Sequence, residues 1–278
     1  MISAGILQTL KYSDHFGFPL TLSELHLRLV SSDPCSLERV IGTLQPMLHK
    51  KLISQTGDYY HLPGRSSLVA RRLKRAKLAT PQLARAKYLS SLLSPLPSIL
   101  SIFLTGSLAM RNSNPNSDID LMIIAKPGRL WTTRLFLTLY TSLLGLRRTP
   151  NSTHNIGKLC LNLYLTPTTY DLPSIKQSLY TAYELLQAIP LYDPQDTRSS
   201  LLAANPWIKK YLPNFPLPNS AGPGLAGLNN LPARPGPIGI IEKLAYWFQK
   251  AYMKKKITRE LITPDSAFFH PHNPAPKL

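Results

Sequence analysis

Apolar residues recur at helical spacing through the first fifty residues, and short polar breaks separate them. The expected helices cover residues 3–17, 21–29 and 36–48. Thr21 and Glu24 form a capping-box pattern at the start of the second helix. Two short strand patterns, 52–55 and 59–62, follow, and Gly57 between them is a hairpin-turn signal. The pattern therefore predicts three helices and a β-hairpin.

This order of helices and hairpin resembles the winged helix-turn-helix modules that are fused to many prokaryotic proteins. The resemblance implies that residues 1–64 form one module, with the third helix as the groove-reading element and the hairpin as the wing. Pro46 departs from the pattern, because a proline inside a helix costs about 3 kcal/mol or kinks the helix. Two interpretations stay open: the module contacts DNA, or it only packs against a neighbouring domain or a partner protein.

Residues 65–98 are expected to form a basic helical connector. Its basic residues occur with no acid among them and are Arg65, Arg71, Arg72, Lys74, Arg75, Lys77, Arg85 and Lys87. Leucines between them predict a helix, and Pro81 predicts a break in that helix. Either this stretch grips phosphates, in which case nucleic acid would contact residues 36–87, or it is a solvated connecting helix.

Residues 99–190 show strand and helix patterns in the order β-α-β-α-β-α, which predicts an α/β layer. The expected strands cover 102–105, 119–125 and 159–165, and the expected helices cover 107–110, 130–146 and 175–188. Regular alternation in the third strand would give it two distinct faces. One face would carry Leu159, Leu161, Leu163 and Leu165, and the other Cys160, Asn162 and Tyr164.

Residues 191–278 are expected to form a helical C-terminal region with a Pro/Gly-rich linker at 211–239. A last helix, from Ile240 to about Leu261, carries an apolar stripe and a cluster of lysines. Two placements stay open for this helix: it lies in a membrane interface, or it docks on the protein core. The most apolar run, 135–146, is too short to cross a bilayer, so no membrane span is expected.

The charge balance adds an expectation about partners. The 278 residues contain 32 Lys and Arg against 14 Asp and Glu, a formal net charge of +18. Such an excess favours a polyanion: nucleic acid, a nucleotide or an anionic membrane surface. The two cysteines, Cys35 and Cys160, have no metal-like spacing, and the first residues show no signal-peptide pattern. A cytoplasmic location is therefore expected.

Two aspartates stand out in this acid-poor chain because they accompany an apolar strand pattern. On a regular strand Asp118 and Asp120 point the same way. Two carboxylates that close repel each other unless a cation lies between them, and hard oxygen ligands suit Mg²⁺. Gly106 and Ser107 lie at a strand-to-helix junction, where glycine and the following amides favour the approach of a phosphate. Together these residues predict a site for a metal ion and a nucleoside triphosphate.

The segment Leu104-Thr105-Gly106-Ser107, followed after ten residues by Asp118-Ile119-Asp120-Leu121, resembles the signature of the DNA polymerase β-like nucleotidyltransferase superfamily. The match is strongest to its minimal and aminoglycoside nucleotidyltransferase-like branch and covers about residues 99–190. The resemblance implies an α/β (α+β) nucleotidyltransferase fold with a small mixed sheet, preceded by the winged-helix module and followed by helices.

The resemblance also implies a reaction and its residues. Asp118 and Asp120 would hold Mg²⁺ or Mn²⁺ and be catalytic, and Gly106 and Ser107 would bind the nucleotide. An NTP, with ATP expected, would pass its nucleoside monophosphate to the hydroxyl of an unknown protein or small-molecule acceptor. Pyrophosphate would be released.

One position departs from the pattern of that superfamily. Its members usually carry a third carboxylate on a neighbouring strand, and Asn162 stands at the central inward position of the expected strand. An amide has no charge and cannot act as a base, so Asp171 or Glu184 would have to substitute, or the acceptor needs no protein base. Two functions stay open: an active nucleotidyltransferase, or a catalytically weakened nucleotide-binding regulator that binds DNA through its N-terminal module.

Overall fold

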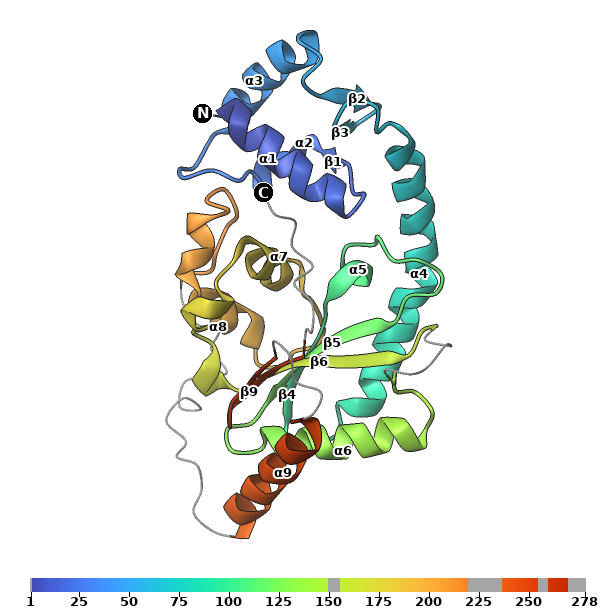
Figure 1. Ribbon diagram of the computed structural model, residues 1–278, viewed down its shortest axis with the longest axis vertical. Coiled ribbons are helices and arrows are strands. Elements are labelled where there is room, and N and C mark those ends of the chain that lie inside the picture. Colours follow the sequence, from blue (N-terminus) through green and yellow to red (C-terminus); the bar gives the residue numbers. More distant parts are fainter. Residues whose placement is uncertain (1, 150–155, 220–236, 255–259, 270–278) are drawn as a thin grey trace.

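The computed structural model describes residues 2–149, 156–219, 237–254 and 260–269 (Figure 1). The chain is mixed α/β and has two sheets, a small antiparallel sheet near the N-terminus and a larger mixed sheet in the middle. This agrees with the α/β class that the sequence predicts. Helices before and after the strands of the larger sheet cover both of its faces.

The N-terminal part consists of three helices and a three-stranded sheet. These elements are α1 (Ile2–His15), β1 (Leu20–Thr21), α2 (Leu22–Leu27), α3 (Leu37–His49), β2 (Ser54–Thr56) and β3 (Tyr59–His61). Strand β3 is central and pairs antiparallel with β1 and β2. The predicted capping box begins α2: Glu24 accepts from the Thr21 N–H at 2.9 Å, and Thr21 Oγ1 accepts from the Glu24 N–H at 3.4 Å. Pro46 lies inside α3, which continues to His49.

A single long helix, α4 (Ser67–Leu93), connects the two sheets. It runs along one side of the molecule and is about 40 Å long at 1.5 Å per residue (Figure 1). The predicted break at Pro81 is wrong, because the helix continues through it. The cost of the proline is offset by burial on both sides, where Ala79, Ala86 and Leu89 pack against the larger sheet.

The larger sheet has six strands in the order β7-β4-β5-β6-β9-β8. The strands are β4 (Ile99–Leu104), β5 (Ile119–Ala125), β6 (Leu159–Leu165), β7 (Ile189–Tyr192), β8 (Leu261–Ile262) and β9 (Ser266–Phe268). Strands β5 and β6 are parallel, and the other described pairs are antiparallel. The sheet is therefore mixed, and β4 and β5 form its centre together with β6.

Two apolar cores lie on the two faces of this sheet. On one face, α4, α6 (Leu130–Leu143) and α9 (Pro237–Met253) contribute to a core around Trp131. On the other face, α7 (Leu179–Gln187) and α8 (Thr197–Ala203) pack around Phe103. Short elements complete the chain: α5 (Gly106–Ala109), η1 (Pro167–Thr169), η2 (Ser174–Lys176) and η3 (Pro206–Lys210).

Strand β6 contains a bulge that the alternating pattern did not predict. Leu121 pairs with Leu161, but Met122 pairs with Leu163, so Asn162 is an extra residue opposite β5. The predicted single face of four leucines is therefore wrong. Leu159 and Leu161 face the core around Trp131, whereas Leu163 and Leu165 face the core around Phe103.

The C-terminal region differs from the predicted linker and helix. The predicted linker 211–239 begins with packed chain: Leu212 is fully buried, and the side chain of Asn214 bonds the backbone of Cys35 and His26 in the N-terminal part. Residues 220–236 lie outside the described chain, and α9 begins at Pro237. Strands β8 and β9 extend the larger sheet beyond β6. Among the described helices, none has the length and apolar character needed to cross a membrane.

Candidate functional site

Gly106 lies where β4 ends and the single turn of α5 begins. Its φ is +67°, a conformation that favours glycine, and the Thr105 N–H binds the Asp120 carbonyl oxygen at 2.9 Å. A Cβ atom at Gly106 would lie 2.3 Å from Asp120 Oδ2. The turn therefore brings bare backbone against the Asp120 carboxylate, and any side chain at this position would displace that carboxylate. Because α5 has only four residues, it supplies little of the helix dipole that a longer helix would.

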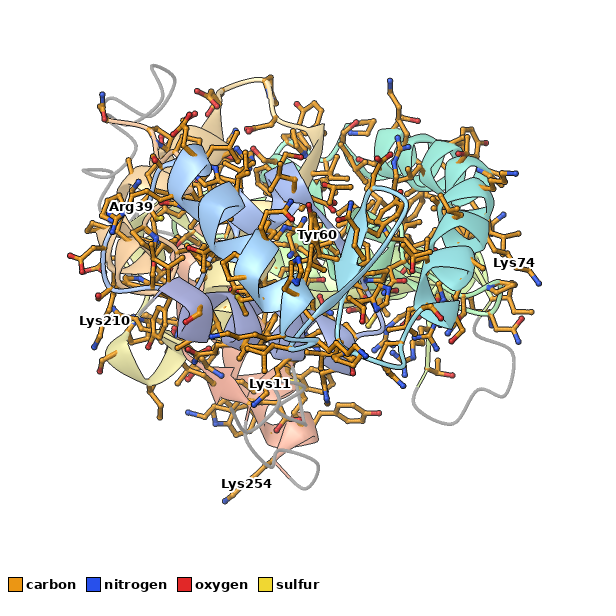
Figure 2. The ribbon with its side chains drawn as sticks, turned by 90° about the horizontal axis from the view of Figure 1, so that it is seen from above. Lys11, Arg39, Tyr60, Lys74, Lys210 and Lys254 are labelled. Atoms are coloured by element: carbon orange, nitrogen blue, oxygen red, sulfur yellow. The ribbon has the colours of Figure 1, made fainter. Side chains whose placement is uncertain are left out.

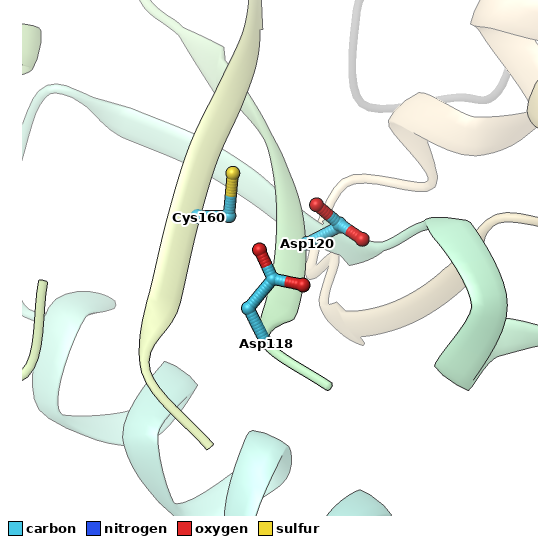
Figure 3. Close-up of side chains that lie close together, drawn as sticks. All are labelled: Asp118, Asp120 and Cys160. Carbon is cyan, nitrogen blue, oxygen red and sulfur yellow. The ribbon is translucent and has the colours of Figure 1, made fainter. Parts of the chain in front are cut away.

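Asp118 and Asp120 lie close together, as the sequence predicted. Asp120 is the second residue of β5, and Asp118 directly precedes the strand. One ligand atom from each of Asp118, Asp120 and Cys160 lies within 4.8 Å of the others. Figure 3 shows these side chains gathered at neighbouring strands, with Cys160 on β6. The parallel register explains the third member, because Asp120 pairs with Cys160.

Arg148 is a residue of this site that the sequence did not predict. Its Nη1 contacts Asp118 Oδ2 at 2.6 Å, and its backbone N–H binds the Leu159 carbonyl oxygen at 2.9 Å. The Arg148 and Asp118 side chains are 43% and 19% exposed, so the pair stands at the mouth of the site. The sequence signal is only a basic pair, Arg147-Arg148, after an apolar helix. Its partner depends on long-range register, which the sequence does not reveal.

Asn162 lies beside Asp120 because of the bulge in β6. Its Nδ2 donates to Asp120 Oδ1 at 3.0 Å. Asn162 is only 7% exposed, yet among the described residues no donor reaches its Oδ1. A buried acceptor without a donor is costly, about 1–3 kcal/mol, and is typically explained by a water or an ion. The Asn162 Oδ1 could therefore accept a hydrogen bond from one further donor or bind a cation.

The protonation state of Cys160 bears on which metal ions the cluster can bind. Burial first, and then the charges of Asp120 and Asp118, raise the pKa of the Cys160 thiol to about 12. Without a metal ion the thiol is therefore neutral at pH 7, and the charged ligands of the cluster are the two carboxylates. A pair of carboxylate oxygens with a nearby amide oxygen suits Mg²⁺ or Mn²⁺, which prefer oxygen donors. These residues therefore fit the ion that the sequence predicted.

A cavity of about 560 Å³ opens beside this cluster. From the larger sheet and its turns it is lined by Gly106, Ser107, Asp120, Arg148, Cys160 and Asn162. The N-terminal part and α4 add Tyr12, Ser13, Phe16, Phe18, Arg28 and Arg75, and α7 adds Tyr180, Tyr183, Glu184 and Gln187. The walls of the cavity therefore come from both halves of the chain, and its volume suits a small molecule.

The structure distinguishes Glu184 from Asp171, the two acids that could substitute for the third carboxylate that Asn162 replaces. Glu184 lines the cavity from α7, together with Asp120. Asp171 is exposed and is not among the residues that line it. Burial first, and then the Glu184 charge, raise the pKa of Tyr180 far above its usual range, so this hydroxyl stays protonated beside Glu184. Glu184 is therefore the acid that the fold brings to the site.

Half of the basic residues in α4 and just before it are bound within the protein. Arg65 pairs with Asp14 and Arg72 with Glu24, each at 2.7 Å. Arg75 bonds Asn112 and Asn114, and Arg85 bonds the Gly157 carbonyl oxygen. These contacts tie the helix to α1 and α2 and to the loops that precede β5 and β6. Other lysines point outward, and Figure 2 shows Lys74, Lys210 and Lys254 projecting on different sides of the molecule.

Comparison with known proteins assigns no family. No protein-family model matches the chain, and no curated protein or solved structure matches it. The class of the protein therefore rests on its own residues: a mixed α/β chain with a carboxylate cluster at a strand-to-helix turn.

Proposed function

We propose that this protein is a nucleotidyltransferase that depends on Mg²⁺ or Mn²⁺. It passes a nucleoside monophosphate from an NTP, with ATP expected, to the hydroxyl of a protein or small-molecule acceptor. The observation that carries this proposal is the contact between the Gly106 turn and the Asp120 carboxylate at the edge of a large cavity. Phosphate and metal must meet at one place in such a reaction, and we propose that they meet at this contact.

Each residue near this contact has a role in the proposal. Asp118 and Asp120 would hold the metal ion, which would neutralise the triphosphate charge and orient it. Gly106 and Ser107 line the cavity next to Asp120 and would bind the triphosphate through their backbone amides. The orphaned Oδ1 of Asn162 supports a cation beside Asp120. Arg148, which pairs with Asp118, would bind the phosphates once Asp118 turns to the metal.

Glu184 is the proposed base. The acceptor oxygen attacks the α-phosphorus, its bond to that phosphorus forms, and the bond from the phosphorus to the bridging oxygen breaks. Pyrophosphate leaves with the electron pair, and the acceptor proton passes to the Glu184 carboxylate. Asn162 cannot take this proton, whereas Glu184 shares the cavity with Asp120.

Transfer of label from an α-labelled NTP tests the proposal. Asp118→Asn and Asp120→Asn are expected to abolish transfer, and Glu184→Gln is expected to slow it by about 10²-fold or more. Asp58→Asn is the matched control, because Asp58 is exposed in the β2–β3 hairpin. Mass spectrometry of the protein and its co-purifying molecules, searched for an added nucleoside monophosphate, identifies the acceptor. NTP binding without transfer to any small molecule, protein or RNA would count against the enzyme.

A second function, a nucleotide-binding regulator that contacts DNA, is favoured by two observations. Asn162 leaves the metal cluster with one charge fewer than an active site of this class usually has. In addition, Arg39 on α3 and Lys50-Lys51 after it are exposed, and α3 lies at the far end of the molecule from the larger sheet (Figure 1). Retention of duplex DNA at moderate salt, weakened by Arg39→Gln, is the expected result. Failure to retain duplex DNA would remove this alternative.

A further inference from the structure

Helix α9 turns its apolar side toward solvent. Its exposed apolar residues are between 55% and 70% accessible and are Ile240, Ile241, Leu244, Trp247, Phe248 and Tyr252. Their spacing places them on one broad side of the helix. A surface helix normally buries such a stripe, so this arrangement is the reverse of the usual one. Contiguous exposed apolar surface of this kind marks an interaction site.

The inward side of α9 fixes this orientation through polar contacts. Glu242 accepts from the backbone N–H groups of Trp131 and Thr132 at 2.6 and 2.9 Å. Gln249 is buried and donates to the Trp131 carbonyl oxygen at 2.8 Å. Turning the helix to bury its apolar stripe would leave these groups of α6 without partners. The exposure therefore belongs to the folded state.

Lysines border the apolar stripe of α9. Lys243, Lys250 and Lys254 are exposed. They are spaced seven and four residues apart, which keeps them on one side of the helix. The acid of the described helix, Glu242, faces inward. Figure 2 shows Lys254 projecting into solvent. The outer side of α9 therefore presents apolar and aromatic residues with positive charge along one border.

Helix α6, which packs against α9, adds exposed apolar side chains of its own. Phe136, Leu139 and Leu143 are 48%, 62% and 86% exposed. Both helices lie at the end of the molecule opposite α3 (Figure 1). That end combines exposed apolar residues with lysines, whereas the candidate site opens between the larger sheet and the N-terminal helices. A surface bound at this end would leave the cavity accessible.

We propose that α9 binds the surface of an anionic lipid bilayer, lying parallel to it. Trp247 and Tyr252 have the amphipathic rings that favour the headgroup region, and Phe248 and Leu244 would enter the acyl boundary. The lysine border complements anionic headgroups, as does the net charge of +18. A second copy of the chain fits less well, because the outer side of α9 offers its lysines no acid.

Vesicle binding followed through Trp247 tests this proposal. The other tryptophans are Trp131, which is fully buried, and Trp207, which is partly buried. Phosphatidylcholine vesicles with about one third phosphatidylglycerol are expected to shift the emission to shorter wavelength, and pure phosphatidylcholine vesicles far less. Trp247→Phe should lose the shift while the protein still floats with the anionic vesicles. Equal binding to both vesicle types, or to neither, overturns the proposal.

Substitutions separate the apolar and the charged contributions. Phe248→Glu is expected to abolish co-flotation, and Lys250→Gln to weaken the partition coefficient roughly fivefold on anionic vesicles. Tyr88→Glu on α4 is the matched control, because Tyr88 is 64% exposed and lies on another element. Thermal unfolding verifies that each variant is folded. A lipid-free dimer that forms with increasing concentration and is lost in Phe248→Glu would instead show that a second copy covers α9.

Discussion

Gly106 has a left-handed backbone conformation, and the Asp120 carboxylate leaves no space for a side chain on it. The φ of +67° costs a non-glycine residue about 1–2 kcal/mol, and the Asp120 oxygen occupies the position of a Cβ atom. Gly57 in the β2–β3 hairpin has a similar φ of +56°, but no atom of the described residues lies within 4 Å of its Cβ position. Alanine substitutions at these two glycines would therefore distinguish the effect of backbone strain from the effect of displacing the carboxylate.

Gly106→Ala and Gly57→Ala are predicted to share the backbone cost and to differ at the site. Each should lose about 1–2 kcal/mol in the free energy of unfolding, measured by urea denaturation. Gly106→Ala should in addition weaken Mg²⁺-dependent NTP binding by at least tenfold, since Asp120 must move, a cost of about 1.4 kcal/mol or more. Equal NTP binding by both variants would contradict the role assigned to the turn.

Asn162 is the residue at which a charge can be restored. Asn162→Asp would set a third carboxylate against Asp120, whose oxygen now accepts from the Asn162 amide at 3.0 Å. Without divalent ions the variant is expected to be less stable by about 1–3 kcal/mol, because a hydrogen bond is replaced by repulsion. Mg²⁺ should recover much of this loss. Thermal unfolding with EDTA and with Mg²⁺ measures both effects, and Asn162→Ala, which adds no charge, should show no such gain from Mg²⁺.

Local sequence was sufficient for some residues of the site and not for others. The proximity of Gly106 and Ser107 to Asp118 and Asp120 could be predicted because they lie on strands β4 and β5 or next to them, and these strands are neighbours in sequence and pair directly. Cys160 and Arg148 join them through the pairing of β5 with β6 and through the chain after α6. Such pairing is set by tertiary packing, and a bulge of one residue changes which side chains face the site.

At the scale of elements, the ion pair between α2 and α4 holds the N-terminal helices to the long helix. Arg72 donates to both carboxylate oxygens of Glu24 at 2.7 Å, and its guanidinium stacks over Phe18 at 4.0 Å. Burial alone would raise the pKa of Glu24. The hydrogen bonds from Arg72 and Thr21, with the charges of Arg72 and Arg28, outweigh burial and lower it.

A double-mutant cycle on Glu24→Gln and Arg72→Gln is predicted to give a coupling energy of about 2 kcal/mol at pH 7. Because the folded pKa of Glu24 lies below 4.5, its stabilisation is full above that pH and is lost as the pH falls through the folded pKa. Urea unfolding at pH 7 and pH 3 measures the difference. The more exposed pair Arg65–Asp14, with side chains 45% and 22% exposed, is the control and should couple by less than about 1 kcal/mol.

Element types were more predictable than their extents and neighbours. Periodicity located the three N-terminal helices and the strands of β4 to β6, because spacing reports local geometry. It predicted a break at Pro81 because the burial that keeps α4 continuous comes from the distant sheet. It also left the placement of α9 open, since polar contacts of Glu242 and Gln249 with α6 decide which side faces inward.

At the scale of the whole molecule, the N-terminal part forms one wall of the cavity. Tyr12 stacks on Tyr183 with ring centroids 4.5 Å apart, and the Tyr183 hydroxyl donates to the Arg28 carbonyl oxygen at 2.9 Å. Asn214 adds a further tie to His26 and Cys35. A ligand that fills the cavity would therefore contact elements from both halves and stabilise their association.

Hydrogen exchange is predicted to report this coupling across the cavity. Mg²⁺ with ATP at about 100 times its Kd should slow exchange by up to about 100-fold in α1 near Tyr12, as well as in the Gly106 turn, because opening either wall would release the ligand. Asp58→Asn should show the same protection, and Asp118→Asn should lose it in both places. Protection confined to the Gly106 turn would mean that the nucleotide does not reach the N-terminal wall, which would leave that wall for the acceptor.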